Sequence, residues 1–318
     1  MQEKATYSRS HVRYRQTARK QNSSWSKIAL VLFVGMILFA TINFEASSLY
    51  AFVEKSFFGG THGIQTQNFD PAYAKQTLLT RQVPVNEINN TRHLELINHN
   101  FPITQEPHKN SLTTTYPQVA SSSDSMLLNI AALDALTEML RDAQQNAPFE
   151  TLCLTSGYRD LQKQISLYEQ AVDKSYVQQP NHSEHQSGLA ADIWVMEVEG
   201  DDISQTQTGQ WLKENSWQYG YILRYAQDKT NITKISAESW HFRYIGKPHA
   251  WFSWKNNLCF EEYISHLKET GGYRATYNGI TYTVLYVLPN DGIVNVPDHA
   301  NYSISSDNTG GYLITIWE

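Results

Sequence analysis

The sequence predicts an α+β fold built on a small antiparallel sheet with flanking helices. Two observations predict this class. Between residues 123 and 270, segments with apolar residues at helical spacing are interleaved with short apolar segments typical of buried strands. The two kinds of segment follow one another in a mixed order rather than in strict alternation, which favours an antiparallel sheet.

Each expected element follows from a local pattern. The first helix is predicted to begin after Ser123-Asp124, which supply an N-cap, and Gly157 is predicted to end the first strand. The expected helices span residues 126–145, 160–172, 210–219 and 249–267. The expected strands span residues 149–156, 189–198, 221–225 and 239–245.

Composition narrows the possible functions. The chain has 318 residues, and its formal net charge of −6 gives no reason to expect nucleic acid as a partner. Its two cysteines, Cys153 and Cys259, exclude a disulfide-dense scaffold and a cysteine-rich zinc finger, and the sequence does not decide whether they pair. Any metal site must therefore use His, Asp and Glu ligands.

The N-terminus has the features of a transmembrane anchor. Residues 1–27 carry seven lysines and arginines against one acidic residue, and residues 28–44 are apolar and uncharged. A spanning helix needs about 20 residues, which the segment provides when counted from Trp25. The basic tail should stay in the cytoplasm, which places the rest of the chain outside on a single-pass anchor in the cell membrane. A cleaved signal peptide and a buried soluble helix are the alternatives.

Three further regions follow the anchor. Residues 45–122 are rich in Asn, Thr and Gln with scattered prolines, and we interpret them as a stalk or linker with some strand-like pieces, such as LLTRQVPVN. Residues 123–270 form the predicted central domain. Residues 271–318 alternate apolar and polar positions, with Asn278-Gly279 and Asp291-Gly292 as turns, and predict a small all-β module.

The segment SEHQSGLAADIW raises the question of chemistry. His185 and Asp192 supply two metal ligands if the chain between them turns back, and Gly188 permits such a turn. The alternative is a turn into a buried strand that happens to carry an acid. Burying Asp192 in an apolar strand is unfavourable unless it is paired or metal-bound, which favours the metal.

The best candidate for a third ligand is His241, in the segment AESWHFRY. Glu238 precedes it by three residues, a spacing that places a carboxylate beside a metal-bound imidazole in the position of a general base. Arg159 follows a buried strand and Gly157, where a loop would expose it beside the site to bind a carboxylate or an oxyanion. Its alternative role is a surface ion pair with Asp160 or Glu169.

Three motifs together resemble the zinc D-alanyl-D-alanine carboxypeptidases of the VanY type, which are related to VanX-type dipeptidases and L,D-carboxypeptidases. They are the strings TSGYRDLQKQ, SEHQSGLAADIW and ESWHFRYIG. The family pattern S-x-H-x-x-G-x-A-x-D is met by Ser183, His185, Gly188, Ala190 and Asp192. The resemblance covers about residues 123–267, and Asn181-His182 stand where the family often has Pro-Gly before the Ser-x-His.

The resemblance implies a role for each residue. Zn²⁺ would be bound by His185, Asp192 and His241. Glu238 would be the general base, and Arg159 would polarise the scissile carbonyl and stabilise the oxyanion. Ser183 and Gln164 would help to bind the terminal carboxylate of the substrate.

The substrate implied by the resemblance is a peptidoglycan stem peptide ending in D-alanine. Removal of the terminal D-alanine would lower the number of D-Ala-D-Ala ends that glycopeptide antibiotics bind. Two alternatives stay open. One is an L,D-carboxypeptidase that acts on tetrapeptide stems, and the other is a non-catalytic domain that binds the cell wall. Glu238 argues against the second, since a binding domain has no use for a base.

Overall fold

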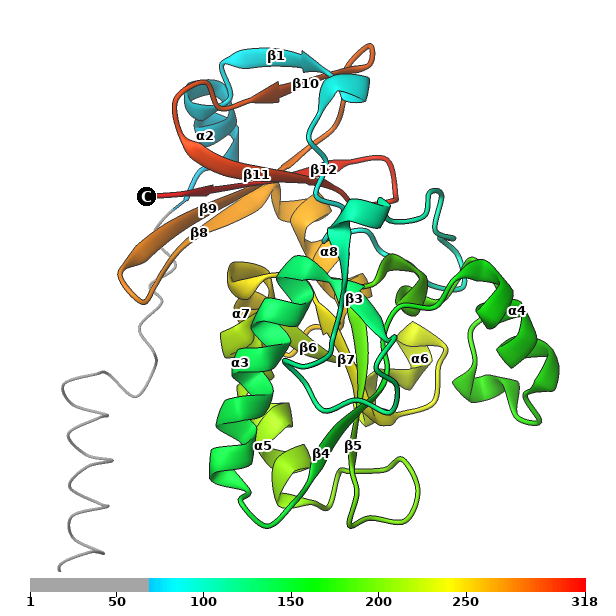
Figure 1. Ribbon diagram of the computed structural model, residues 1–318. Helices are drawn as coiled ribbons and strands as arrows, with labels where there is room; N and C mark the ends of the chain where they lie inside the picture. The colour runs from blue at the N-terminus through cyan, green and yellow to red at the C-terminus, as the bar shows by residue number, and fades with distance from the viewer. Residues whose placement is uncertain (1–68) are drawn as a thin grey trace, which may run out of the picture. The chain divides into compact units, whose positions relative to one another are not determined.

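The computed structural model describes residues 69–318, which belong to one compact unit (Figure 1). Among these residues, no helix combines the length and the apolar character that crossing a membrane requires. The predicted basic tail 1–27, the predicted anchor 28–44 and residues 45–68 of the predicted stalk lie outside the described residues.

The predicted α+β class is confirmed, and the central sheet has four antiparallel strands in the order β4-β5-β7-β6. These strands are β4 (Leu152–Ser156), β5 (Ala190–Val195), β6 (Tyr221–Tyr225) and β7 (Glu238–Tyr244). The helices of this region are α3 (Ile130–Asn146), α4 (Leu161–Gln170), α5 (Gln207–Asn215), α6 (Thr230–Thr233), α7 (Lys247–Lys255) and α8 (Phe260–Thr270). All four strands fall close to their predicted positions, as do α4 and α5, while α6 was not predicted. Below, this sheet is called the central sheet.

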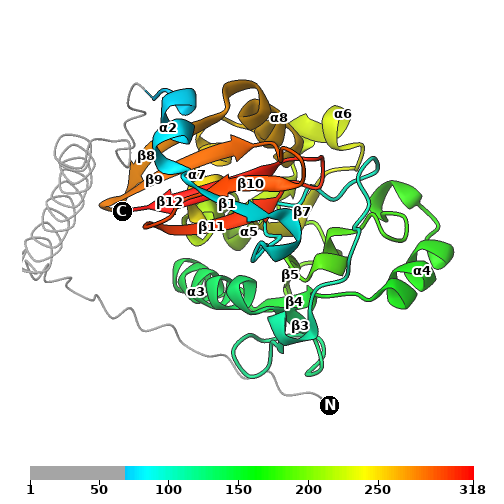
Figure 2. The same ribbon diagram turned by 90° about the horizontal axis from the view of Figure 1, so that it is seen from above.

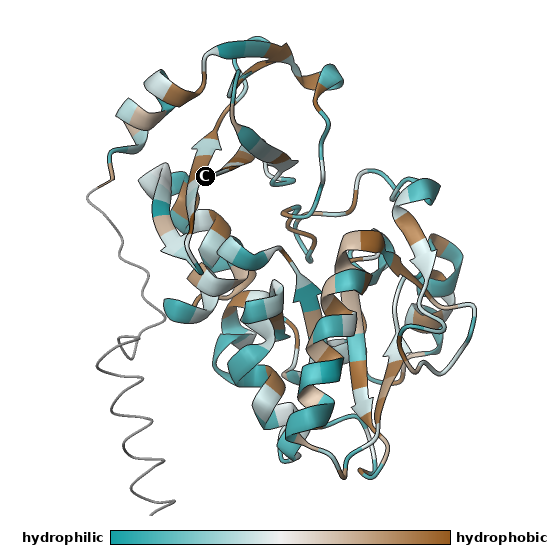
Figure 3. Ribbon diagram, turned by 60° about the vertical axis from the view of Figure 1, so that its left-hand side comes forward, coloured by the Kyte–Doolittle hydropathy of each residue, from teal (hydrophilic) through white to brown (hydrophobic). Residues whose placement is uncertain are grey.

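Helix α3 covers the central sheet with one apolar face. Its buried residues recur at helical spacing: Ala132, Leu133, Leu136, Met139, Leu140 and Ala143. They pack with strand residues such as Leu154, Ile193 and Phe242 in one core cluster. In Figure 3 hydrophobic residues run along the strands, while much of the helical surface is hydrophilic.

Two predicted helix boundaries are wrong. Helix α3 is capped by Asn129, whose Oδ1 accepts a hydrogen bond from the Ala131 amide at 3.0 Å, and not by Ser123-Asp124. The residues before it form β3 (Leu127–Asn129), which pairs with β2 (Leu112–Thr114). The predicted helix 249–267 is two helices, because Asn257 is left-handed with φ 49° and Cys259 begins α8 with a capping box to Glu262.

A second four-stranded antiparallel sheet, here called the C-terminal sheet, has the order β11-β12-β9-β8. Its strands are β8 (Gly272–Tyr277), β9 (Ile280–Val287), β11 (Asn301–Ser306) and β12 (Tyr312–Trp317), and β10 (Ile293–Val296) lies apart from them. The predicted turn at Asn278-Gly279 joins β8 to β9, with both residues at positive φ.

The described part of the predicted stalk, residues 69–122, contains packed helices and strands, and its predicted strand-like piece LLTRQVPVN includes β1 (Arg81–Pro84). These residues form α2 (Pro71–Leu78), β1 and β2, and β1 pairs with β10. Figure 2 shows α2, β1 and β10 over one face of the C-terminal sheet, whose other face packs on α7 and α8. Local sequence indicates the strand-like piece at β1 but not what it packs on, because the partners of α2 and β1 lie about 200 residues further along the chain.

Candidate metal centre

Two strands and one tight turn bring the three predicted ligands together. Asp192 on β5 and His241 on β7 are directly opposite each other in the antiparallel pair. His185 lies in a short 3-10 helix (Glu184–Ser187) that ends at Gly188, which is left-handed at φ 73°. A Cβ on Gly188 would approach Leu112 Cδ2 to 2.6 Å, so both the conformation and the space favour glycine.

A bulge in β7 places Glu238 beside His241. Leu223 on β6 pairs with Phe242 on β7, and Tyr225 on β6 pairs with Glu238 on β7. A step of two residues along β6 therefore corresponds to a step of four residues along β7. The extra residues interrupt the normal alternation of sides, and bulges often re-aim side chains in this way next to active sites. As a result Glu238 Oε2 lies 3.5 Å from His241 Nδ1.

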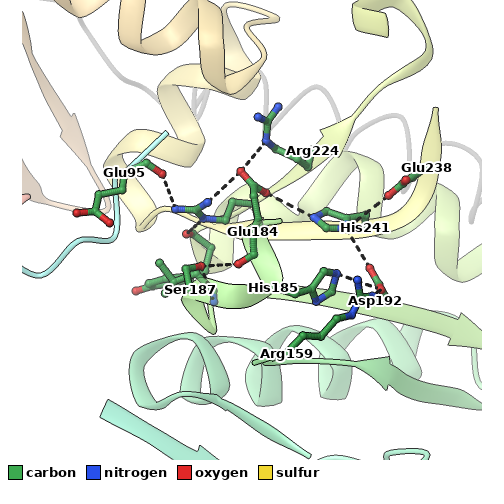
Figure 4. Close-up of polar contacts among 12 residues, drawn as sticks. Glu95, Arg159, Glu184, His185, Ser187, Asp192, Arg224, Glu238 and His241 are labelled. Carbon is green, nitrogen blue, oxygen red and sulfur yellow. Dashed lines mark hydrogen bonds and ion pairs between the residues drawn. The ribbon is translucent and has the colours of Figure 1, made fainter. Parts of the chain in front are cut away.

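The three predicted ligands form one buried cluster (Figure 4). A ligand atom from each of His185, Asp192 and His241 lies within 4.8 Å of the others. The two oxygens of Asp192 divide between the imidazoles: Oδ2 lies 3.2 Å from His185 Nε2, and Oδ1 lies 3.0 Å from His241 Nδ1. The structure therefore assembles the side chains that the sequence proposed as a set.

Hydrogen bonds behind the cluster fix the orientation of His185. Its Nδ1 lies 2.7 Å from the carbonyl oxygen of Gly157. A carbonyl only accepts, so Nδ1 carries the proton, and the lone pair of Nε2 points toward Asp192. For His241 the opposite nitrogen, Nδ1, faces the cluster, and its Nε2 lies 3.5 Å from Glu184 Oε2.

Burial and neighbouring charges shift the pKa values of all four groups. Burial, with Arg159 nearby, lowers the pKa of His185 to about 4. Burial also disfavours charge on His241, but hydrogen bonds with Asp192 and Glu184 outweigh it and raise its pKa to about 9. Burial raises the pKa of Glu238 to about 8. For Asp192 the two histidines outweigh burial and hold the carboxyl pKa well below its usual range.

Arg159 lies at the edge of the cluster. Its Nη2 donates to Asp192 Oδ2 at 3.0 Å, and its Nε donates to Ser156 Oγ at 2.9 Å. The alternative ion pairs with Asp160 or Glu169 do not form among the described residues. Its Nη1 has no hydrogen-bond acceptor within residues 69–318, so this group is available to a ligand.

Ser183 and Gln164 are both buried but are not joined to the cluster by hydrogen bonds in residues 69–318. Gln164 donates from Nε2 to the carbonyl of Gln178 at 2.7 Å, which ties helix α4 to the following loop. Its Oε1 is buried without a partner in the same region. A role for either residue in substrate binding stays a prediction.

A group of buried charges that was not predicted from the sequence lies next to the cluster. Glu184 is fully buried and contacts two fully buried arginines, Arg224 of β6 and Arg243 of β7. Burial alone would raise the pKa of Glu184, but the two guanidinium groups outweigh it and lower the pKa far below its usual value. The signal was present, since Arg224 and Arg243 interrupt apolar strands as Asp192 does.

The cluster has the chemistry of a divalent metal site. Asp192 Oδ1 is buried, and beyond its 3.0 Å contact with His241 Nδ1 it has no polar partner within the described residues, although buried polar atoms are normally satisfied. Two imidazole nitrogens and one carboxylate oxygen are a usual donor set for a catalytic metal that keeps one position open. Both Cys153 and Cys259 are free thiols outside this group.

The chain is similar to known carboxypeptidases and dipeptidases. The family model of VanY, described as D-alanyl-D-alanine carboxypeptidase, matches residues 125–247. A D-alanyl-D-alanine carboxypeptidase of Enterococcus faecium is 32% identical over 239 residues, covering 70% of this chain and 75% of the relative. VanXYC of Enterococcus gallinarum, a bifunctional D-Ala-D-Ala dipeptidase and D-Ala-D-Ala carboxypeptidase, is 37% identical over 129 residues, covering 37% of this chain and 68% of that protein.

Among solved structures, the vancomycin-resistance D,D-dipeptidase VanXYg in complex with a D-Ala-D-Ala phosphinate analogue is similar with a TM-score of 0.64. The sequence identity is 28%, and the similarity covers 75% of this chain and 98% of that structure. The likeness therefore extends beyond the central domain into part of the remaining described chain.

Proposed function

Because the chain belongs to the VanY family of D-alanyl-D-alanine carboxypeptidases, we propose that His185, Asp192 and His241 bind a catalytic Zn²⁺. The enzyme would remove the terminal D-alanine from peptidoglycan stem peptides. The observation that carries the proposal is the convergence of these three buried side chains beside a fourth, Glu238.

Glu238 is suited to move a proton. A bound zinc ion acts as a Lewis acid and lowers the pKa of water toward about 7. Glu238 takes the proton of the attacking water and delivers it to the amine of the departing D-alanine. Burial raises the pKa of Glu238 to about 8, closer to neutral pH than that of an ordinary glutamate, and a general base and acid is most effective when its pKa lies near the operating pH.

Arg159 is suited to bind the scissile carbonyl oxygen. Its guanidinium is already held beside the cluster by Asp192 and Ser156. That leaves Nη1 free among the described residues to donate toward developing negative charge. Because the site is largely buried, such a donor acts with little competition from water.

The setting of the enzyme is part of the proposal. The basic segment 1–27 followed by the uncharged segment 28–44 supports a single-pass anchor in the cell membrane, with the catalytic residues outside, where the cell wall is. Removal of D-alanine there would deplete D-Ala-D-Ala ends and so contribute to glycopeptide resistance. Protease protection of the residues after 44 in sealed inside-out vesicles, lost on lysis, tests this orientation.

Release of D-alanine from purified pentapeptide stems, with and without chelator, tests the activity. We expect release that chelator abolishes and added Zn²⁺ restores. Glu238→Gln should bind zinc normally and release none, which separates loss of the base from loss of the metal. Turnover of tetrapeptide stems alone would indicate L,D specificity, and binding without turnover would indicate a non-catalytic wall-binding domain; either result contradicts the proposal.

A further inference from the structure

Glu184 stands between the metal cluster and two buried arginines (Figure 4). Its Oε1 accepts a hydrogen bond from Arg224 Nε at 2.8 Å and lies 2.9 Å from Arg243 Nη1. Its Oε2 faces the other way and lies 3.5 Å from His241 Nε2. Within residues 69–318 neither Oε2 nor Nε2 has a closer hydrogen-bond partner, and both atoms are buried.

The position of the proton on His241 decides which nitrogen can bind a metal. Nδ1 faces Asp192 at 3.0 Å and Glu238 at 3.5 Å, so this nitrogen points into the cluster. It offers a lone pair only when the proton of the neutral ring is on Nε2. When Nδ1 gives up its proton to bind a metal, the remaining proton must be on Nε2, and Glu184 is the acceptor that faces it there.

The arginines keep the carboxylate of Glu184 in place. Arg224 also binds Glu261 with two hydrogen bonds, of 2.9 and 2.7 Å. Arg243 donates through Nη2 to the backbone carbonyls of His93 and Glu95, at 3.1 and 3.0 Å. Two carboxylates thus balance two guanidinium groups, which permits this set of charges to be buried. The contacts also connect the site to residues 93–95 and to helix α8.

We propose that Glu184 is a positioning residue that holds His241 with its proton on Nε2 and its Nδ1 directed at the metal. The inference rests on the proposed metal site, since it concerns how one of its ligands is prepared. It does not make Glu184 a ligand, because its Oε2 faces Nε2, the nitrogen of His241 that points away from the cluster. Partners that orient a ligand histidine typically change metal affinity by about 10- to 100-fold.

Glu184→Gln is an informative change because an amide has two unlike ends. The two guanidinium groups only donate, so they would face the amide oxygen. The amide NH₂ would then point at His241 Nε2 and make that nitrogen an acceptor. The proton would move to Nδ1, the nitrogen needed for the metal.

The experiment measures zinc affinity by competition with a chromophoric chelator, for the wild type, Glu184→Gln and Glu261→Gln. Both variants remove one negative charge from the same arginine, but Glu261 does not contact His241. We expect Glu184→Gln to bind zinc about 10- to 100-fold more weakly. Glu261→Gln should stay within about threefold of the wild type, because its effect on zinc is only indirect. Co²⁺-substituted Glu184→Gln should also show a changed visible spectrum.

Several outcomes would overturn the inference. Wild-type zinc affinity in Glu184→Gln, or an equal loss of zinc affinity in Glu184→Gln and Glu261→Gln, would mean that Glu184 has only a structural role. If Glu184→Gln does not fold, Glu184→Asp retains the charge but withdraws the carboxylate from His241, and it should still weaken zinc binding; unchanged affinity there contradicts the proposal. Absence of zinc binding in the wild type would instead contradict the proposed function.

Discussion

The two four-stranded sheets of this protein differ in the kind of polar side chain that they bury and in the regularity of their strand pairing. The central sheet carries buried ionisable side chains on three strands, among them Asp192, Arg224 and His241, and its register is broken twice. In the C-terminal sheet the buried polar side chains of the strands are uncharged, such as Thr283 and Thr315, and the paired strands keep register throughout.

This difference shows where each sheet contributes. The C-terminal sheet buries apolar residues on both faces, against α7 and α8 on one side and against α2, β1 and β10 on the other. Such burial stabilises the fold and has no chemistry of its own. In the central sheet, part of the interior is made of charged side chains that must balance one another. The cluster beside its bulges carries the groups suited to bind a metal and move a proton. Substitutions in the central sheet should therefore affect zinc binding and turnover, whereas substitutions in the C-terminal sheet should affect the free energy of unfolding.

The largest expected effect comes from His241→Ala in the central sheet. Removing one of three ligands should lower zinc content to background and abolish D-alanine release. The C-terminal sheet does not depend on this side chain, so far-UV circular dichroism should stay close to that of the wild type. Zinc analysis of the purified variant provides the measurement, and one equivalent of bound zinc would contradict the assignment of His241 as a ligand.

Leu313→Ala should have the converse effect. Leu313 is fully buried between the C-terminal sheet and the residues of α7 and α8. Truncating a buried leucine typically lowers the free energy of unfolding by about 2–5 kcal/mol. Urea unfolding should show this loss, while zinc affinity and turnover at low temperature stay near the wild type. A folded Leu313→Ala variant that fails to bind zinc would mean that the two sheets are not separable in this way.

Arg159→Ala, beside the central sheet, should lower turnover without affecting zinc binding. Loss of one donor to a developing oxyanion costs about 3–4 kcal/mol, or about a hundredfold to a thousandfold in kcat. Zinc stoichiometry should not change, because Arg159 reaches the cluster only through Asp192 Oδ2. Steady-state kinetics on pentapeptide stems measure the effect. Turnover within a factor of two of the wild type would exclude Arg159 from the reaction.

The same contrast explains what could be predicted from the sequence. The hairpin turn at Asn278-Gly279 was predictable because its sequence and the alternation around it are local signals. Asp192 was predictable because an acid within an apolar strand has few explanations, while His185 and His241 were indicated by the motifs around them. The role of Glu184 was not predictable: Arg224 and Arg243 stand out within apolar strands, but no local pattern shows that Glu184, in a 3-10 helix, meets both of them.

The packing of residues 69–122, in the region interpreted as a stalk, was not predictable for a related reason. The sequence of residues 69–122 has weak periodicity, since β1 has a single buried residue and gains its order from pairing with β10. Helix α2 likewise buries only Ala74 within its span. Segments of this kind are stabilised by distant partners, and local patterns cannot reveal those partners.

The smallest expected effect tests the link between the two regions. His249 on α7 is buried, with Nδ1 2.6 Å from Tyr263 Oη and Nε2 3.0 Å from Thr315 Oγ1 on β12. Burial lowers the pKa of His249 to about 3. Above pH 6.5 the ring is neutral in both the folded and unfolded states, so its protonation has no effect on stability there. As the pH falls from about 6.5 toward 3, the unfolded state binds the proton first and stability is lost, by up to about 1.4 kcal/mol per pH unit.

His249→Gln should therefore flatten the fall in unfolding free energy between pH 6 and 4, measured by urea titrations of metal-free protein at several pH values. Glutamine keeps a donor and an acceptor for Tyr263 and Thr315 but cannot take up the proton. His299→Gln is the matched control, because the His299 side chain is 91% exposed and the change should leave the slope as it is. Equal slopes in His249→Gln and the wild type would show that the contact between α7 and β12 is not sensitive to acid, and that other groups cause the loss of stability at low pH.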